Sequence, residues 1–422
     1  MPADRPAPVR LDDLAAPRFT PDIAALRESI APMADAIRLE PDPLIAEARD
    51  ATGLEDLGDR GGGAAARLTL LLTALREEGG LTAFGVVNNH GLITQLLKNR
   101  LLLTDLLARH PEIHDVRIER PIVVAGLPRT GTTHLHNLLA ADPALRSLPY
   151  WESLEPVLPE HDRPAPGMPD PRIERTAFAL GIVNASMPYF VRMHEMTADH
   201  AHEEIQLLAM DFSSMLFETM TPMPRWRDDY LARDQTPHYE YLRQVLQALQ
   251  WLRGGERWVL KSPQHLEQLG PLLRVFPDAT VVLCHRDPVA VTGSVTTMLA
   301  YTARMASDHP DPVAIGRYWA DRIETLLTAC LRDRDTVAGE RCVDVRFPEL
   351  LAGEQRVVER IYAAADQPLT EGARAAMDEF LTTHPRGRHG TVVHDLAAVG
   401  VDPEERRGAM TAYTDRFDLP PE

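Results

Sequence analysis

The chain has 422 residues, of which 44% are hydrophobic and 25% are charged, the balance of a globular protein that buries a large core. Its 62 acidic and 44 basic side chains give a net charge of -18, which disfavours binding to nucleic acid and to anionic membrane surfaces. No apolar run is long enough to cross a bilayer, and the first residues lack a signal-peptide pattern. Three cysteines without a CxxC pair indicate reduced thiols, so we expect a cytoplasmic protein without integral membrane association.

The front of the chain has a helical pattern. Residues 1–20 are expected to form a flexible leader. Apolar residues then recur at helical spacing through residues 23–37, 44–51, 65–76 and 93–108. We therefore expect residues 21–118 to form a helical region packed on the core.

From residue 119 onward, short β-branched runs alternate with helical patterns. The runs occupy residues 121–126, 258–260, 279–284 and 342–347, and this alternation is typical of a doubly wound parallel sheet. We therefore assign residues 119–422 to one α/β domain with a P-loop-containing nucleotide-binding fold, a central parallel sheet flanked by helices. A methionine- and proline-rich stretch at about 156–237 is too long for a simple crossover. We expect it to be an acceptor-binding insertion that contains a buried helix over residues 205–217.

The first run leads into a sequence typical of a phosphate-binding loop. Glycines between a strand and a helix let backbone N–H groups point at one anion, as in a Walker A loop. The Walker lysine is absent, because Thr132 stands in its place, and this disfavours a nucleoside triphosphate. Instead, the planar guanidinium of Arg129 can hold the oxygens of a phosphosulfate. The candidate cofactor-binding residues here are Gly126, Pro128, Arg129, Thr130, Gly131, Thr132 and Thr133.

A second anion-binding segment follows the third run. Arg286 ends this strand, and Ser294 lies eight positions later in the next helix. A strand, a loop and a helix at this spacing bring both side chains to the ligand-binding edge of the sheet. Two separate phosphate sites indicate a nucleotide with phosphates in two places. Taken singly, Arg286 paired with a surface acid would be the simpler interpretation.

These residues resemble the PAPS-dependent sulfotransferases (PAPS is 3′-phosphoadenosine 5′-phosphosulfate), and specifically a bacterial branch whose loop reads GLPRTGTT. The resemblance covers most of the chain from about residue 45, including the segments 150–152, 260–266 and 276–279. It implies PAPS as co-substrate, no required metal, and transfer of a sulfuryl group to a hydroxyl of a small-molecule acceptor. It also implies a closing basic loop near the C-terminus, for which Arg386 and Arg388 are the candidates; a merely solvated basic loop is the alternative.

The expected chemistry needs a base for the acceptor proton and cations for the developing negative charge. The resemblance implies Glu152 as the base, beside Tyr150 and Trp151, with Arg129 and Lys261 as catalytic cations. His194 and His200 are alternative bases. Their histidine-rich run lacks HExxH spacing, so a zinc site is not expected.

Three questions stay open at this stage. The insertion carries many methionines and aromatic residues, which suit a hydrophobic acceptor but also suit a plain core. A kinase-like, NTP-dependent transferase and a non-catalytic nucleotide-binding protein are the alternative functions. The acceptor and the oligomeric state are not indicated by the sequence.

Overall fold

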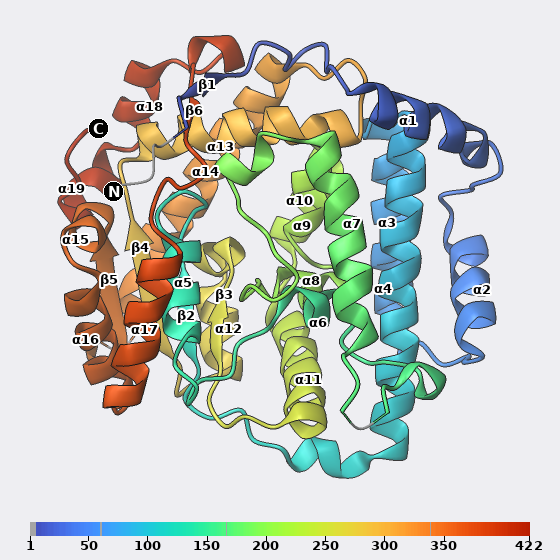
Figure 1. Ribbon diagram of the computed structural model, residues 1–422, viewed down its shortest axis with the longest axis horizontal. Helices are drawn as coiled ribbons and strands as arrows, with labels where there is room; N and C mark the ends of the chain where they lie inside the picture. Colours follow the sequence, from blue (N-terminus) through green and yellow to red (C-terminus); the bar gives the residue numbers. More distant parts are fainter. Residues whose placement is uncertain (1–5, 60, 166, 338) are drawn as a thin grey trace.

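The computed structural model describes residues 6–59, 61–165, 167–337 and 339–422. A parallel sheet flanked by helices lies in the left half of Figure 1. The sheet has the order β3-β2-β4-β5, and all pairs are parallel. Its strands are β2 (Ile122–Ala125), β3 (Val259–Lys261), β4 (Thr280–His285) and β5 (Cys342–Arg346). Each strand lies within one residue of a β-branched run of the sequence, so the predicted α/β fold is confirmed.

Helices cover both faces of the sheet, because its strands alternate in the direction of their side chains. Val123 of β2 belongs to a core shared with α12 (Leu269–Val275), α13 (Pro288–Thr302) and α14 (Pro312–Asp333). Val124 belongs to the opposite core, which is shared with α5 (Thr132–Ala140), α16 (Glu354–Ala365) and α17 (Glu371–Thr383). The helices that follow β2 and β4 thus lie on opposite faces. Ligands bind at such a topological switch point, next to the carboxyl ends of the strands.

The N-terminal helices pack on the sheet domain. They are α1 (Pro21–Ala34), α2 (Pro41–Thr52), α3 (Gly63–Glu78) and α4 (Ala83–Arg109), and they lie on the right of Figure 1. Leu72 of α3 and Leu97 of α4 are fully buried in the same core as Val123. The helical region and the sheet domain therefore share one continuous core.

The leader differs from the flexible segment expected over residues 1–20. β1 (Val9–Arg10) pairs in parallel with β6 (Val392–Val393), and Leu14 is buried in the main core. Residues 1–5 lie outside the described part of the chain. The rest of the leader thus holds the segment that contains β6 against the core.

The insertion is largely a packed layer of helices. It contains α7 (Pro171–Ser186), α8 (Ile205–Ala209), α9 (Leu216–Met220) and α10 (Pro224–Ala232), and α11 (Thr236–Arg253) follows it. The single helix predicted over residues 205–217 is wrong, because Phe212 has a left-handed φ of 54° between α8 and α9. Its most buried methionines are core residues, each at most 5% exposed: Met187, Met193, Met210, Met215 and Met223.

The remaining helices are α6 (Tyr150–Leu154), α15 (Phe347–Ala352), α18 (Pro403–Ala409) and α19 (Thr411–Phe417). Within the described residues, no helix is both long enough and apolar enough to span a membrane.

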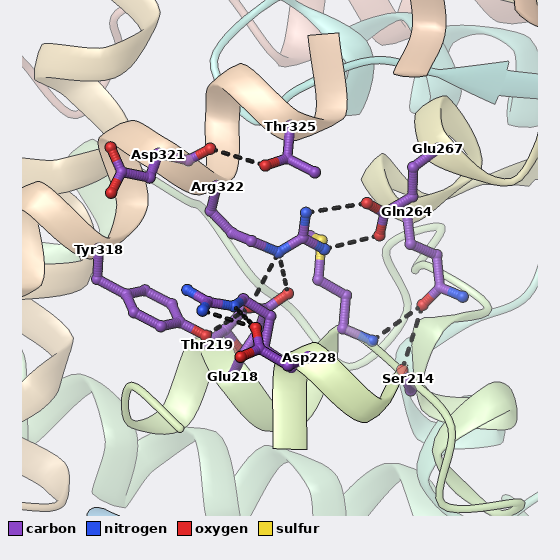
Figure 2. A network of polar contacts seen from close by, with 12 residues as sticks. Ser214, Glu218, Thr219, Asp228, Gln264, Glu267, Tyr318, Asp321, Arg322 and Thr325 are labelled. Carbon is purple, nitrogen blue, oxygen red and sulfur yellow. Dashed lines mark hydrogen bonds and ion pairs between the residues drawn. The ribbon is translucent and has the colours of Figure 1, made fainter. Parts of the chain in front are cut away.

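A buried ion network ties the insertion to the sheet domain (Figure 2). Arg322 of α14 is 1% exposed in its side chain and donates to Glu218 of α9 at 2.8 and 3.1 Å. It also donates to both oxygens of Glu267, which follows β3, at 2.9 and 2.7 Å. Tyr318 donates to Glu218 at 2.8 Å. One guanidinium thus bridges two buried carboxylates.

We expect Arg322→Met to lower the free energy of unfolding by about 3–5 kcal/mol, because it leaves two buried carboxylates without a counter-ion. Denaturant unfolding measures this change. Arg332→Met is the matched control, since Arg332 pairs with Asp333 at the surface, and its effect should stay within about 0.5 kcal/mol. Equal losses in the two variants would contradict this account.

Candidate functional site

The loop from β2 to α5 has the backbone of an anion cradle. A Cβ at Gly126 would lie 2.7 Å from Thr132 Cγ2, and Gly131 has a left-handed φ of 89°. The Thr130 hydroxyl donates to the carbonyl of Leu127 at 2.7 Å and so closes the turn. The first-turn N–H groups of α5 have no intrahelical acceptor and face this loop. Thr132, at the Walker lysine position, is 2% exposed and part of the packing.

Arg129 places an unbalanced positive charge in this loop. Its φ of 75° is rare for a residue with a side chain. Its Nε donates to Ser294 Oγ at 3.0 Å, and its Nη1 donates to the carbonyl of Met193. Burial, and then the nearby charge of Arg286, lower the pKa of Arg129 to about 10. No carboxylate of the described chain pairs with it, and an enclosed cation without a counter-ion indicates an anion site.

The two segments predicted to bind phosphate are brought together. Arg286, directly after β4, donates from Nη1 to the carbonyl oxygen of Arg129 at 2.7 Å. Its guanidinium lies 4.1 Å from the centre of the Phe347 ring and also pairs with the side chain of Glu422. Ser294 lies in α13 and contacts Arg129. Both segments therefore form one site at the switch point between β2 and β4.

His394 is a residue of this site that sequence reasoning missed. Its Nε2 lies 3.1 Å from Ser294 Oγ. Burial, and then Arg129 and Arg286, lower the pKa of His394 to about 4, so the imidazole is neutral at pH 7. Its position just after the basic loop was the only signal in the sequence.

Lys261 lies at the carboxyl end of β3, on the other side of β2. Its Nζ donates to Thr133 Oγ1 at 3.3 Å and pairs with Glu203. Its backbone N–H donates to Glu204 at 2.9 Å, and the same carboxylate lies 2.5 Å from His265 Nε2. Burial alone would raise the pKa of Glu204, but its interactions with His265 and Lys261 hold it below the usual value. This buried support fixes the lysine beside the start of α5.

Histidines surround Lys261. Burial, and then the charges of Lys261, His200 and Arg129, lower the pKa of His194 to about 3. His200 has both ring nitrogens engaged, one 2.5 Å from the carbonyl of Thr197 and one 3.1 Å from His202. The imidazole of His194 makes no hydrogen bond within the described chain. Of the two histidines proposed as bases, His194 is thus the one whose ring nitrogens are not engaged within the described chain.

Glu152 does not lie with the other predicted catalytic residues. Its carboxylate is fully buried and accepts from Arg146 at 2.6 Å and from Arg253 at 3.0 Å. Arg146 bridges to Trp258, next to the amino end of β3, whereas Lys261 is at the carboxyl end. Both carboxylate oxygens are engaged in ion pairs, so the structure gives Glu152 a structural environment instead of the open position that a base needs.

The basic loop lies at the rim of the site and is held by glutamates. Arg386 pairs with Glu354 at 3.1 Å and donates to the carbonyl of Leu350, whose side chain packs against Gly131. Arg388 pairs with Glu195, the neighbour of His194. Arg386 is therefore close to the phosphate loop, and Arg388 to the histidines.

The comparisons with known proteins identify the family. The model of the sulfotransferase family matches residues 121–371, and the chain belongs to this family. It is similar to the crystal structure of sulfotransferase STF1 from Mycobacterium tuberculosis H37Rv, with 31% identity over 87% of this chain and 97% of that chain and a TM-score of 0.75. It is also similar to STF9 from Mycobacterium avium, with 29% identity over 91% and 98% of the two chains and a TM-score of 0.80. No curated protein matches the sequence.

Family membership establishes the predicted activity class: the protein is a sulfotransferase, a member of a PAPS-using family of transferases. Within the described ranges, no group of three histidine, cysteine or acidic side chains is arranged to hold a metal.

The buried histidines predict a pH dependence of stability. His136 is fully buried, and burial, followed by Lys261, lowers its pKa to about 4. Below about pH 6.5 the unfolded chain binds a proton that the folded chain does not, so the free energy of unfolding falls as the pH drops from about 6.5 to 4. His136→Gln keeps a donor for the carbonyl of Val259. It should reduce the loss between pH 7.5 and 5.5, measured by urea unfolding, by about 1 kcal/mol. Identical losses would contradict the assignment.

Proposed function

We propose that the protein transfers the sulfuryl group of PAPS to a hydroxyl of a small organic acceptor, in a reducing cytosol that suits its three free, buried cysteines. The observation that carries this proposal is the contact between Arg286 and Arg129, which joins two cationic segments at one switch point. A nucleotide with phosphates on both sides of its ribose fits such a pair of sites. The buried Thr132 disfavours a triphosphate.

The residues present suit PAPS in both of its anionic groups. Gly126, Pro128, Thr130, Gly131, Thr132 and Thr133 would hold the 5′-phosphosulfate through the loop and the first turn of α5. Arg286 and Ser294 would hold the 3′-phosphate. Arg129, which touches Ser294 from within the loop, would contribute to both halves. Arg386 and Arg388 would close the rim.

PAPS supplies a sulfuryl group on a phosphate leaving group. An imidazole nitrogen of His194 takes the proton from the substrate hydroxyl while the oxygen of that hydroxyl bonds to sulfur. Lys261 Nζ neutralises the charge that develops on the leaving oxygen when the bond from sulfur to that oxygen breaks. Burial is the largest cause of the lowered pKa of His194, and bound anions would oppose the further lowering by Lys261, His200 and Arg129.

The acceptor is proposed to be apolar around its hydroxyl. Phe190 lies 5.7 Å from His194 between ring centres, and Tyr189, Met196 and Met220 are less buried than the core methionines. Such side chains suit an alcohol or phenol with an apolar body.

Isothermal titration calorimetry tests which nucleotide the protein binds. Adenosine 3′,5′-bisphosphate should bind without magnesium, and magnesium-ATP should bind far more weakly. Arg286→Ala should weaken bisphosphate binding about 10- to 100-fold, because a charge-assisted contact to phosphate is lost. Tight binding of ATP but not of the bisphosphate would reject the proposal in favour of a kinase-like transferase.

Turnover tests the roles of Lys261 and His194. Lys261→Ala and His194→Gln should each lower kcat by about 100-fold or more while bisphosphate affinity changes little. Glu152→Gln should instead lower the free energy of unfolding, with kcat retained in the folded fraction. A large loss of kcat in a stable Glu152→Gln protein would restore Glu152 as the base. Full activity of the Lys261 and His194 variants would remove both residues from the chemistry, and absence of turnover in the wild type would favour a non-catalytic nucleotide-binding protein.

A further inference from the structure

The guanidinium expected to bind the 3′-phosphate already has a carboxylate partner. Arg286 Nε donates to the two side-chain oxygens of Glu422 at 2.9 and 3.1 Å, and its Nη2 donates to Glu422 at 2.6 Å. Its Nη1 is used by the carbonyl of Arg129. All three guanidinium nitrogens of Arg286 thus make hydrogen bonds, and the edge formed by Nε and Nη2 is bound to Glu422. A carboxylate and a phosphate present similar oxygen pairs to such an edge.

Glu422 is delivered to this position by packed neighbours. α19 lies against the end of β4, where Phe417 stacks on His285 with ring centres 3.8 Å apart. Leu419 is 8% exposed, and the backbone N–H of Glu422 donates to Asp287 at 3.0 Å. The same Asp287 side chain caps α13 through Val289 at 3.1 Å. The segment therefore ends at the Arg286 edge in a defined conformation.

The pair is also open enough to exchange. The side chains of Arg286 and Glu422 are 19% and 30% exposed, so water can replace either partner as they separate. Ion pairs of this exposure contribute little to stability. A bound dianion could therefore displace Glu422 without unfolding α19.

We propose that Glu422 is an internal competitor of the nucleotide's 3′-phosphate: its carboxylate occupies Arg286 in the free protein and leaves when the nucleotide binds. The inference rests on the proposed function. It requires that the measured affinity for a 3′-phosphorylated nucleotide equals the intrinsic affinity reduced by the fraction of molecules in which Glu422 has left. Nucleotides without a 3′-phosphate do not compete with Glu422 for Arg286.

Titration of the full chain with two nucleotides tests the proposal. Glu422→Gln should bind adenosine 3′,5′-bisphosphate about fivefold more tightly than the wild type, because the competing charge is gone. Its affinity for adenosine 5′-monophosphate should change by less than about twofold. Asp418→Asn is the matched control: it removes one negative charge from the same segment, where Asp418 pairs with Arg346 and its side chain is 92% exposed. Both affinities of this variant should match the wild type.

An unchanged bisphosphate affinity in Glu422→Gln would overturn the inference, as would an equal gain for both nucleotides or an equal gain in Asp418→Asn. These failures are distinct from failure of the proposed function, in which the wild type does not bind the bisphosphate or Arg286→Ala binds it as well as the wild type.

Discussion

The site depends on positive charge held at the carboxyl ends of two adjacent parallel strands. Arg129 follows β2 and Arg286 follows β4, and a hydrogen bond joins one guanidinium to the backbone of the other. Arg129 is enclosed without a counter-ion among the described residues, and this raises the free energy of the free protein. The two loops start side by side because β2 and β4 are adjacent parallel strands. The helices that follow them lie on opposite faces of the sheet, which leaves a crevice between the loops. The fold thus creates a site at which a bound anion stabilises the protein.

Most of the fold, and the proximity of the two segments proposed to bind phosphate, were predictable from the sequence. β-branched runs predicted β2 and β4 because a strand buried on both faces leaves a continuous apolar pattern, which depends only on local residues. The spacing of Arg286 and Ser294 predicted their common edge for the same reason, since a strand, a short loop and a helix have nearly fixed dimensions. Local patterns therefore sufficed wherever one segment alone sets the geometry.

The surroundings of the residues proposed for catalysis depend on contacts between distant segments, which a single sequence does not encode locally. Glu152 follows the phosphate-loop helix, but its carboxylate turns to Arg146 and Arg253 near the amino end of β3. The periodic pattern that suggested one helix over residues 205–217 could not show the left-handed residue Phe212 within it. From the sequence, the leader is expected to be flexible, yet its strand β1 pairs with β6, which is more than 380 residues away in the chain.

The acidic composition of the chain has a local counterpart at the site. Four of the five basic residues predicted for the site pair with glutamates: Lys261 with Glu203, Arg286 with Glu422, Arg386 with Glu354 and Arg388 with Glu195. Only Arg129 has no carboxylate partner in the described chain. A simple anion that binds at one paired cation replaces a carboxylate that is already there, so it gains little binding free energy. A ligand that engages Arg129 first holds its second anionic group at high local concentration beside a paired cation, so the second exchange becomes favourable. The glutamates therefore favour ligands with two separated anionic groups over simple anions.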